Sequence, residues 1–177
     1  MQDFLNISPF FSGFDEKLHS ILSKTISRFP SLFDSRLVNG FERIVSNASS
    51  LFLKDRSRTH VRSLLLAQFC LQKKMEEQIK KDSCAQKHLF LKVFSASSRI
   101  CLALTYSESY AFQKERILKI LQTLLPGIRE IPLSFYLWYH PDYNYYFCYL
   151  EVHKLQGQEF SKQEFKKVEK MLKDQLL

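Results

Sequence analysis

Hydrophobic positions in the first half of the chain recur at the three- and four-residue spacing of amphipathic helices. One such stripe covers 18–29, with Ser12 placed as its cap and Pro30 as its stop. Further stripes predict a second helix over about 31–46 and a third over about 57–81. Because every stripe has to be buried against a neighbour, the three helices are expected to pack on another layer of the protein.

The second half of the chain changes to the period of two that indicates strands. Residues 88–94 and 99–106 alternate between apolar and polar, and the polar turn 95–98 joins them into a hairpin. Helical spacing returns over 112–125, where Pro126-Gly127 suits the end of a helix. The chain is therefore expected to be helical first and mixed afterwards.

A last helix is predicted after Gly157 by the clearest local signal in the chain. Ser161 and Glu164 have the spacing of a capping box, and Phe160 and Phe165 are placed as the hydrophobic staple around it. Helical spacing then continues to the final residue.

Aromatic residues concentrate between 134 and 153. The alternation there predicts a second hairpin that turns at His140-Pro141-Asp142, with proline at the first central position of the turn. One face of this hairpin is largely aliphatic, whereas the other carries tyrosines and the only tryptophan. Tyrosine and tryptophan have polar groups that need partners when they are buried. The main functional question is therefore what covers this second face.

Combining the two hairpins into one sheet sorts their side chains into two sets. The face toward the last two helices is expected to hold Leu89, Leu91, Val93, Ile100, Leu102, Leu104, Leu133, Phe135, Leu137, Tyr146, Cys148, Leu150 and Val152. The opposite face is expected to hold Phe90, Lys92, Phe94, Arg99, Cys101, Ala103, Thr105, Tyr136, Trp138, Tyr145, Phe147 and Tyr149. A one-residue shift would exchange the sets, so the aliphatic character of the first supports this register.

Three interpretations compete for the aromatic face. The N-terminal helices could lie across it, because their stripes need a surface and a large uncovered apolar patch is rare on monomers. It could be a platform for stacking nucleobases, with Lys92, Arg99 and the basic third helix holding phosphates. It could also be a surface for another protein or a second copy, since tyrosine and tryptophan are enriched at interfaces.

These elements predict an α+β fold. A helical region over 1–85, with three helices, is followed over 86–177 by a ββαββα two-layer module with a four-stranded antiparallel sheet, and the two are packed as one unit. From Arg99 onward the order β-α-β-β-α resembles a ferredoxin-like or ACT-like module without its last strand. The strand 88–94 would fill that edge, because a hairpin places it antiparallel to 99–106. The sequence also resembles the N-terminal part of a longer uncharacterised protein family of chlamydia-type bacteria, from which no functional residues carry over.

The charge distribution adds a candidate binding region. The 177 residues carry a formal net charge of +8, and residues 54–99 hold eleven lysines and arginines against four acidic residues. Such an excess indicates an anionic partner, which is nucleic acid, an acidic protein surface or a membrane face, or else a solvated helix face.

Several functional classes lack their sequence signals. The four glycines are far apart, which argues against phosphate-binding glycine loops, and the four cysteines show no CxxC spacing. No apolar run approaches a membrane span, and the N-terminus lacks the basic region of a secretion signal, so a cytoplasmic protein with reduced thiols is expected. His140 and His153 share a predicted face with Glu151, but hairpin histidines are more often turn or surface residues. Cys84 and His88 form only half of a zinc spacing.

The sequence therefore predicts a non-enzymatic binding or regulatory protein-interaction module without cofactor or metal. The alternative is a nucleic-acid-binding protein that uses the basic helix for phosphates and the aromatic face for bases. Ten residues form the predicted binding surface: Arg56, Arg58, Arg62, Lys92, Arg99, Tyr136, Trp138, Tyr145, Phe147 and Tyr149.

Overall fold

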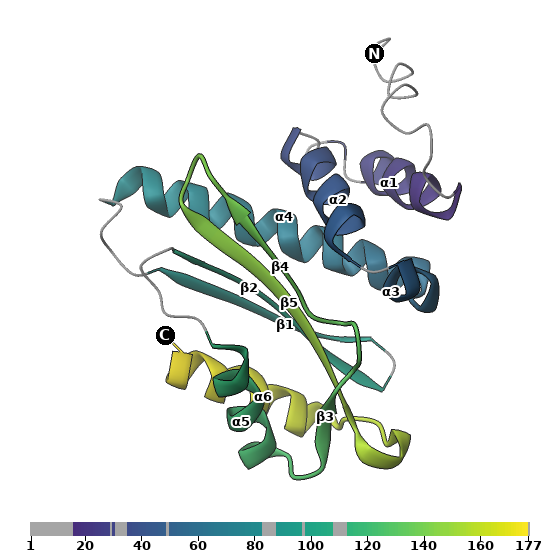
Figure 1. Cartoon of the computed structure of the whole chain (residues 1–177), viewed down its shortest axis with the longest axis vertical. Helices are drawn as coiled ribbons and strands as arrows, with labels where there is room; N and C mark the ends of the chain where they lie inside the picture. Colours follow the sequence, from purple (N-terminus) through teal and green to yellow (C-terminus); the bar gives the residue numbers. More distant parts are fainter. Residues whose placement is uncertain are drawn as a thin grey trace.

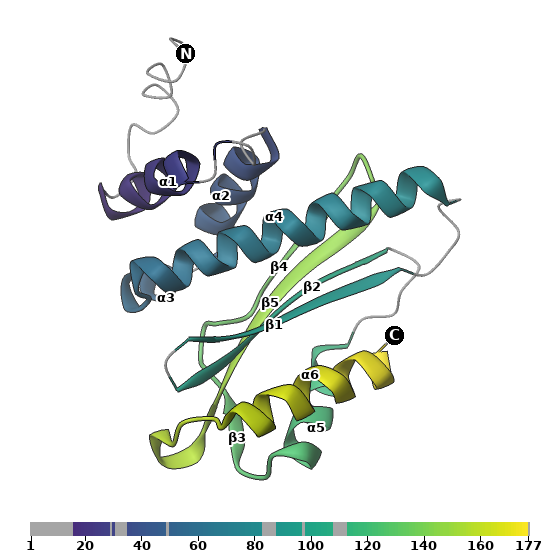
Figure 2. The same cartoon turned by 180° about the vertical axis from the view of Figure 1, so that it is seen from behind.

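The protein is an α+β structure of three layers (Figure 1 and Figure 2). The computed structural model describes residues 16–28, 30, 35–48, 50–82, 88–96, 98–107 and 113–176. Within these residues, four helices lie on one face of a five-stranded antiparallel sheet and two lie on the other. No helix in the described part of the chain has both the length and the apolar character needed to cross a membrane.

The N-terminal layer contains the three predicted helices and one more. α1 (Glu16–Arg28), α2 (Ser35–Asn47) and α4 (Arg58–Lys81) confirm the apolar stripes, whereas the predicted cap at Ser12 lies outside the described residues. The short α3 (Ser50–Asp55) was not predicted, because six residues are too few to show a helical period.

α4 is the longest helix and lies directly against the sheet, and both α1 and α2 pack against it. Its start follows from a local signal, because the side chain of Ser57 accepts a hydrogen bond from the backbone N–H of His60 at 3.2 Å. Gly40 of α2 fits close to α4, where an added Cβ would lie 3.3 Å from the side chains of Gln68 and Gln72.

The sheet has one strand more than predicted. β1 (Leu89–Ala96) and β2 (Arg99–Ser107) form the first hairpin, and β2 pairs with β5 (Tyr145–Lys154). The far edge of β5 pairs with both β4 (Tyr136–His140) and the short β3 (Ile128–Glu130). β3 has only three residues, so no alternation could reveal it. The expected place of β1, at the edge beside β2, is confirmed.

The aliphatic face of the sheet is buried under α5 (Lys114–Leu124) and α6 (Lys162–Leu176). The predicted capping box of α6 is confirmed: the backbone N–H of Ser161 donates to the Glu164 carboxylate at 2.8 Å, and the backbone N–H of Glu164 donates to Ser161 Oγ at 3.2 Å. A short 3-10 helix, η3 (Leu155–Gly157), leads into it from β5.

Two residues assigned to this aliphatic face are exposed instead. Leu133 is 58% exposed and Leu137 is 41% exposed. Leu133 precedes β4 in a turn and has a φ of 59°, while β4 is an edge strand outside the core formed with α5 and α6. The alternation within β4 is therefore as predicted, but the helices do not cover that face of the strand.

The aromatic face is covered by the N-terminal helices. Its large side chains share one core with residues of α1, α2, α3 and α4, and five of them are nearly inaccessible to solvent: Tyr136, Trp138, Tyr145, Phe147 and Tyr149. The structure thus corresponds to the first of the three interpretations, a sheet between two helical layers.

Candidate functional site

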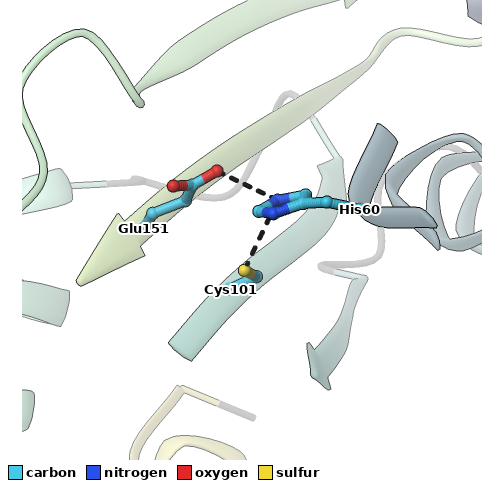
Figure 3. A group of neighbouring side chains, drawn as sticks. All are labelled: His60, Cys101 and Glu151. Carbon is cyan, nitrogen blue, oxygen red and sulfur yellow. Dashed lines mark hydrogen bonds and ion pairs between the residues drawn. The ribbon is translucent and has the colours of Figure 1, made fainter. Parts of the chain in front are cut away.

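A buried polar cluster lies between the start of α4 and the sheet. Its centre is Glu151 of β5, whose side chain is fully buried. His60 of α4 contacts both Glu151 and Cys101 of β2 (Figure 3). Arg56, in the link between α3 and α4, and Tyr149, two residues before Glu151, complete the cluster. Chain segments that are far apart in the sequence are thereby joined through one carboxylate.

Arg56 is the main partner of Glu151. Its Nε donates to both carboxylate oxygens at 3.0 Å, and its second guanidinium nitrogen lies 2.7 Å from Oε2. The guanidinium also stacks over the ring of Phe52, 4.4 Å from the ring centroid. Arg99, which is only half-buried, adds a longer contact of 3.4 Å to Oε2. The buried positive and negative charges are therefore paired.

His60 and Tyr149 complete the coordination of the same carboxylate. The hydroxyl of Tyr149 donates to Oε1 of Glu151 at 2.8 Å, and His60 Nε2 lies 2.8 Å from that hydroxyl and 3.1 Å from Oε1. Since a tyrosine hydroxyl has one proton, and this one goes to Glu151, the hydroxyl accepts from His60. The geometry consequently assigns a proton to His60 Nε2.

The surroundings lower the pKa of Glu151 and raise the pKa values of Cys101 and Tyr149. Burial by itself would raise the pKa of Glu151, but the hydrogen bonds and positive charges of His60 and Arg56 outweigh it and lower the pKa from 4.5 to about 2. Burial raises the pKa of the Cys101 thiol to about 12. Burial also raises the pKa of Tyr149 well above its ordinary value of 10.0. At neutral pH the carboxylate is therefore charged, whereas the thiol and phenol are neutral.

The cluster contains a potential metal-ligand set. Ligand atoms of His60, Cys101 and Glu151 all lie within 4.8 Å of one another, and Cys101 Sγ is 3.7 Å from His60 Nε2. However, both oxygens of Glu151 are bound by the guanidinium of Arg56, and a cation would be placed beside that positive charge. Nε2 of His60, the nitrogen nearest to Glu151, also carries a proton. This arrangement favours an ion-pair network over a metal centre.

The same geometry disfavours nucleophilic catalysis by Cys101. In a catalytic triad the carboxylate orients one nitrogen of the histidine while the other nitrogen accepts the proton of the nucleophile. Here Glu151 and Cys101 both face Nε2 of His60, and that nitrogen is a donor. The raised pKa of Cys101 further lowers its thiolate fraction. The cluster is thus suited to joining the layers rather than to chemistry.

The ten predicted surface residues do not form one surface. Tyr136, Trp138, Tyr145, Phe147 and Tyr149 are in the core, so the prediction that they present a binding face is corrected: the apolar stripes of the helices cover them. Arg56 is buried on Glu151, and Arg99 reaches the same carboxylate. Arg58 and Arg62 lie together at the start of α4, while Lys92 is exposed on β1.

Sequence reasoning missed the cluster, although it named several of its members. Glu151 was paired with His140 and His153, but register places His140 opposite Tyr145, at the other end of β5. The histidine that meets Glu151 is His60, from a different element. The signal available in the sequence was Glu151 itself, a charged residue within the otherwise largely apolar segment that forms β5. The Cys84–His88 pair cannot be placed, because Cys84 lies outside the described residues.

A second candidate region is the outer side of α4. Exposed basic side chains extend along it from the first residue to the last: Arg58, Lys73, Lys74, Lys80 and Lys81. Within α4 the exposed acidic residue is Glu77, because Glu76 is turned inward and pairs with Arg36 of α2 at 3.3 Å.

Comparisons of the chain with protein-family models, curated proteins and solved structures found no match.

Proposed function

We propose that the protein is a non-enzymatic binding module, acting in the cytoplasm, that recognises an acidic protein surface through the outer side of α4. The observation that carries this proposal is the concentration of exposed lysines on the second half of α4: Lys73, Lys74, Lys80 and Lys81. The helix has 24 residues and is about 36 Å long at 1.5 Å per residue, which makes it a long and rigid support for these charges.

The buried cluster supports the non-enzymatic part of the proposal. Glu151 is held by Arg56, His60 and Tyr149 at once, so its lone pairs are used within the fold. A group that serves as acid, base or nucleophile has to reach a substrate, and these side chains are buried.

An acidic protein is favoured over nucleic acid by the position of the aromatic rings. Single-strand binding draws much of its affinity from bases stacked on exposed aromatic side chains. Tyr136, Trp138 and Phe147 are buried under the helices and do not offer that surface. The exposed Leu137 and Tyr139 on edge strand β4 add a second surface of the kind that proteins use for each other.

Exposed ion pairs contribute about 0.2–1 kcal/mol each, so four lysines supply only about 1–4 kcal/mol. That is enough to steer and orient a partner but not to hold it without further contacts. The proposal therefore predicts binding that is fast, salt-sensitive and weak toward a purely acidic probe.

The test measures binding of fluorescently labelled poly-L-glutamate, and of single- and double-stranded oligonucleotides, by anisotropy at low and moderate salt. A K73E/K74E variant should lose binding to poly-L-glutamate. The matched K166E/K170E variant, with the same charge change on exposed lysines of α6, should retain most of it. Equal losses in the two variants would show that net charge, not α4, binds the probe. Tighter binding of an oligonucleotide than of poly-L-glutamate would favour the nucleic-acid alternative.

A further inference from the structure

A small basic pocket lies between α1 and the first turns of α4. It has a volume of about 190 Å³, and its walls are Ser20, Ile21 and Lys24 of α1 with Arg58, Thr59 and Arg62 of α4. The two helices pack against each other there, and Ile21 is part of the core beneath. The pocket is therefore built by a tertiary contact and is not a feature of one helix.

The charge inside this pocket is uncompensated. Lys24, Arg58 and Arg62 bring three positive charges to it, and its walls contain no acidic residue. In the described part of the chain, none of the three forms an ion pair. Like charges four residues apart on a helix, such as Arg58 and Arg62, repel each other. A bound anion would remove this repulsion.

The donors match a tetrahedral dianion. Arginine presents a planar fork that binds two oxygens of one phosphate, and lysine adds a point charge. Ser20 of α1 and Thr59 of α4 also line the pocket, and each carries a hydroxyl group that is able to donate a hydrogen bond. A phosphate monoester carries close to two negative charges at neutral pH and has three strong acceptor oxygens. We propose that this pocket is a binding site for a phosphate monoester group.

This site goes beyond the proposed function, because it involves the beginning of α4 and α1, whereas the lysines proposed for an acidic partner lie on the second half of α4. The phosphate could belong to a small phosphorylated metabolite or to a phosphorylated side chain of a protein. Both present the same dianion to Lys24, Arg58 and Arg62, so the experiment has to separate them.

The experiment is a titration of the full-length, isotopically labelled protein with O-phospho-L-serine, followed by amide NMR shifts. L-Serine is the control ligand. A phosphoserine peptide and glucose 6-phosphate are the two arms that distinguish the sources. We expect O-phospho-L-serine to bind with a Kd of about 1 mM, an affinity suited to a single exposed anion. The shifted amides should be those of Ser20, Lys24, Arg58 and Thr59, and L-serine should produce no shifts.

The variants locate the site. R58Q/R62Q should weaken binding by about tenfold, the change that corresponds to 1.4 kcal/mol. R58K/R62K, which keeps both charges but loses the planar forks, should weaken it by a smaller factor. K166Q/K170Q removes the same charge as R58Q/R62Q from the opposite side of the sheet and should leave the Kd unchanged. Amide spectra of all variants show whether the fold is retained.

Three outcomes would overturn the inference. One is the absence of shifts with O-phospho-L-serine at about ten times the expected Kd. Another is a set of shifts that excludes the residues of the pocket. The third is equal weakening by R58Q/R62Q and K166Q/K170Q, which would mean that only net charge attracts the ligand. Retention of poly-L-glutamate binding in K73E/K74E would contradict the proposed function but would leave these results untouched, so the two proposals can fail separately.

Discussion

Several contacts between distant parts of the sequence meet at Glu151. Its carboxylate joins Arg56, which is 95 positions away in the sequence, and Tyr149, which in turn joins His60. Its backbone N–H donates to the hydroxyl of Ser134 at 3.1 Å. Neither the side chain nor the amide of Glu151 is therefore left without a partner, as burial requires.

Replacement of Glu151 by glutamine should destabilise the protein strongly. The variant keeps the volume of the side chain but leaves the buried guanidinium of Arg56 without a counter-charge, and breaking a buried pair in this way costs about 3–5 kcal/mol. Glu169→Gln, which alters an exposed pair with Lys173, should stay within about 0.5 kcal/mol of the wild type. Urea unfolding of both variants measures the two changes. A small effect of Glu151→Gln would mean that the network contributes little to stability.

The lowered pKa of Glu151 predicts a loss of stability in acid. The pKa is about 2 in the folded protein and about 4.5 ordinarily, so the contribution of the carboxylate is complete above about pH 4.5. It is lost as the pH falls from there toward 2, because the unfolded chain takes up the proton first. The difference in unfolding free energy between wild type and Glu151→Gln should therefore shrink over this window. A difference that is independent of pH would contradict the charged pairing.

At the scale of elements, the cap of α6 offers a local test. Ser161→Ala removes the hydroxyl that accepts from the backbone N–H of Glu164 and should cost about 0.5–2 kcal/mol. Lys162→Ala, at the first helical residue, should be close to neutral because alanine is a good helix former. Thermal unfolding compares them. A lower melting temperature for Lys162→Ala than for Ser161→Ala would place the start of the helix elsewhere.

Elements with several repeats of their period could be predicted from the sequence, and short ones could not. α4 begins within one residue of its expected start, because Ser57 and a long apolar stripe define it. β3 and α3 have three and six residues, and depend on β5 and on the aromatic core to form. The exposure of Leu137 was also missed, since alternation assigns a side chain to a face but does not show how far the covering helices extend.

The candidate site was harder to predict than the fold for a similar reason. Its ion pair and hydrogen bonds connect α4 and its preceding link with β2 and β5, and such contacts are set by tertiary packing, not by local spacing. The basic excess around α4 was visible from composition. Only the structure shows that these basic residues have different environments. Arg56 is buried, Arg58 and Arg62 line a pocket, and the lysines of α4 are exposed.

At the scale of the whole molecule, the two helical layers depend on the sheet between them. A fragment of residues 88–177 would retain the sheet, α5 and α6 but would expose the aromatic face that α1–α4 cover. Such a large exposed apolar patch promotes association, so the fragment should aggregate or remain unfolded, as assessed by light scattering and circular dichroism. A monomeric fragment that unfolds cooperatively would show that the N-terminal helices are not part of the same folding unit.

The covering of the aromatic face is the central claim, since it moves the proposed binding surface from the sheet to α4. Trp138 is the only tryptophan of the chain, so its fluorescence reports on that face directly. It is 6% exposed, with the guanidinium of Arg43 stacked 4.2 Å from its ring centroid. We predict that its emission in the native protein is blue-shifted relative to the urea-unfolded protein and is poorly quenched by iodide. Emission at the wavelength of the urea-unfolded protein, with strong quenching by iodide, would contradict the claim and show that the aromatic face is exposed to solvent.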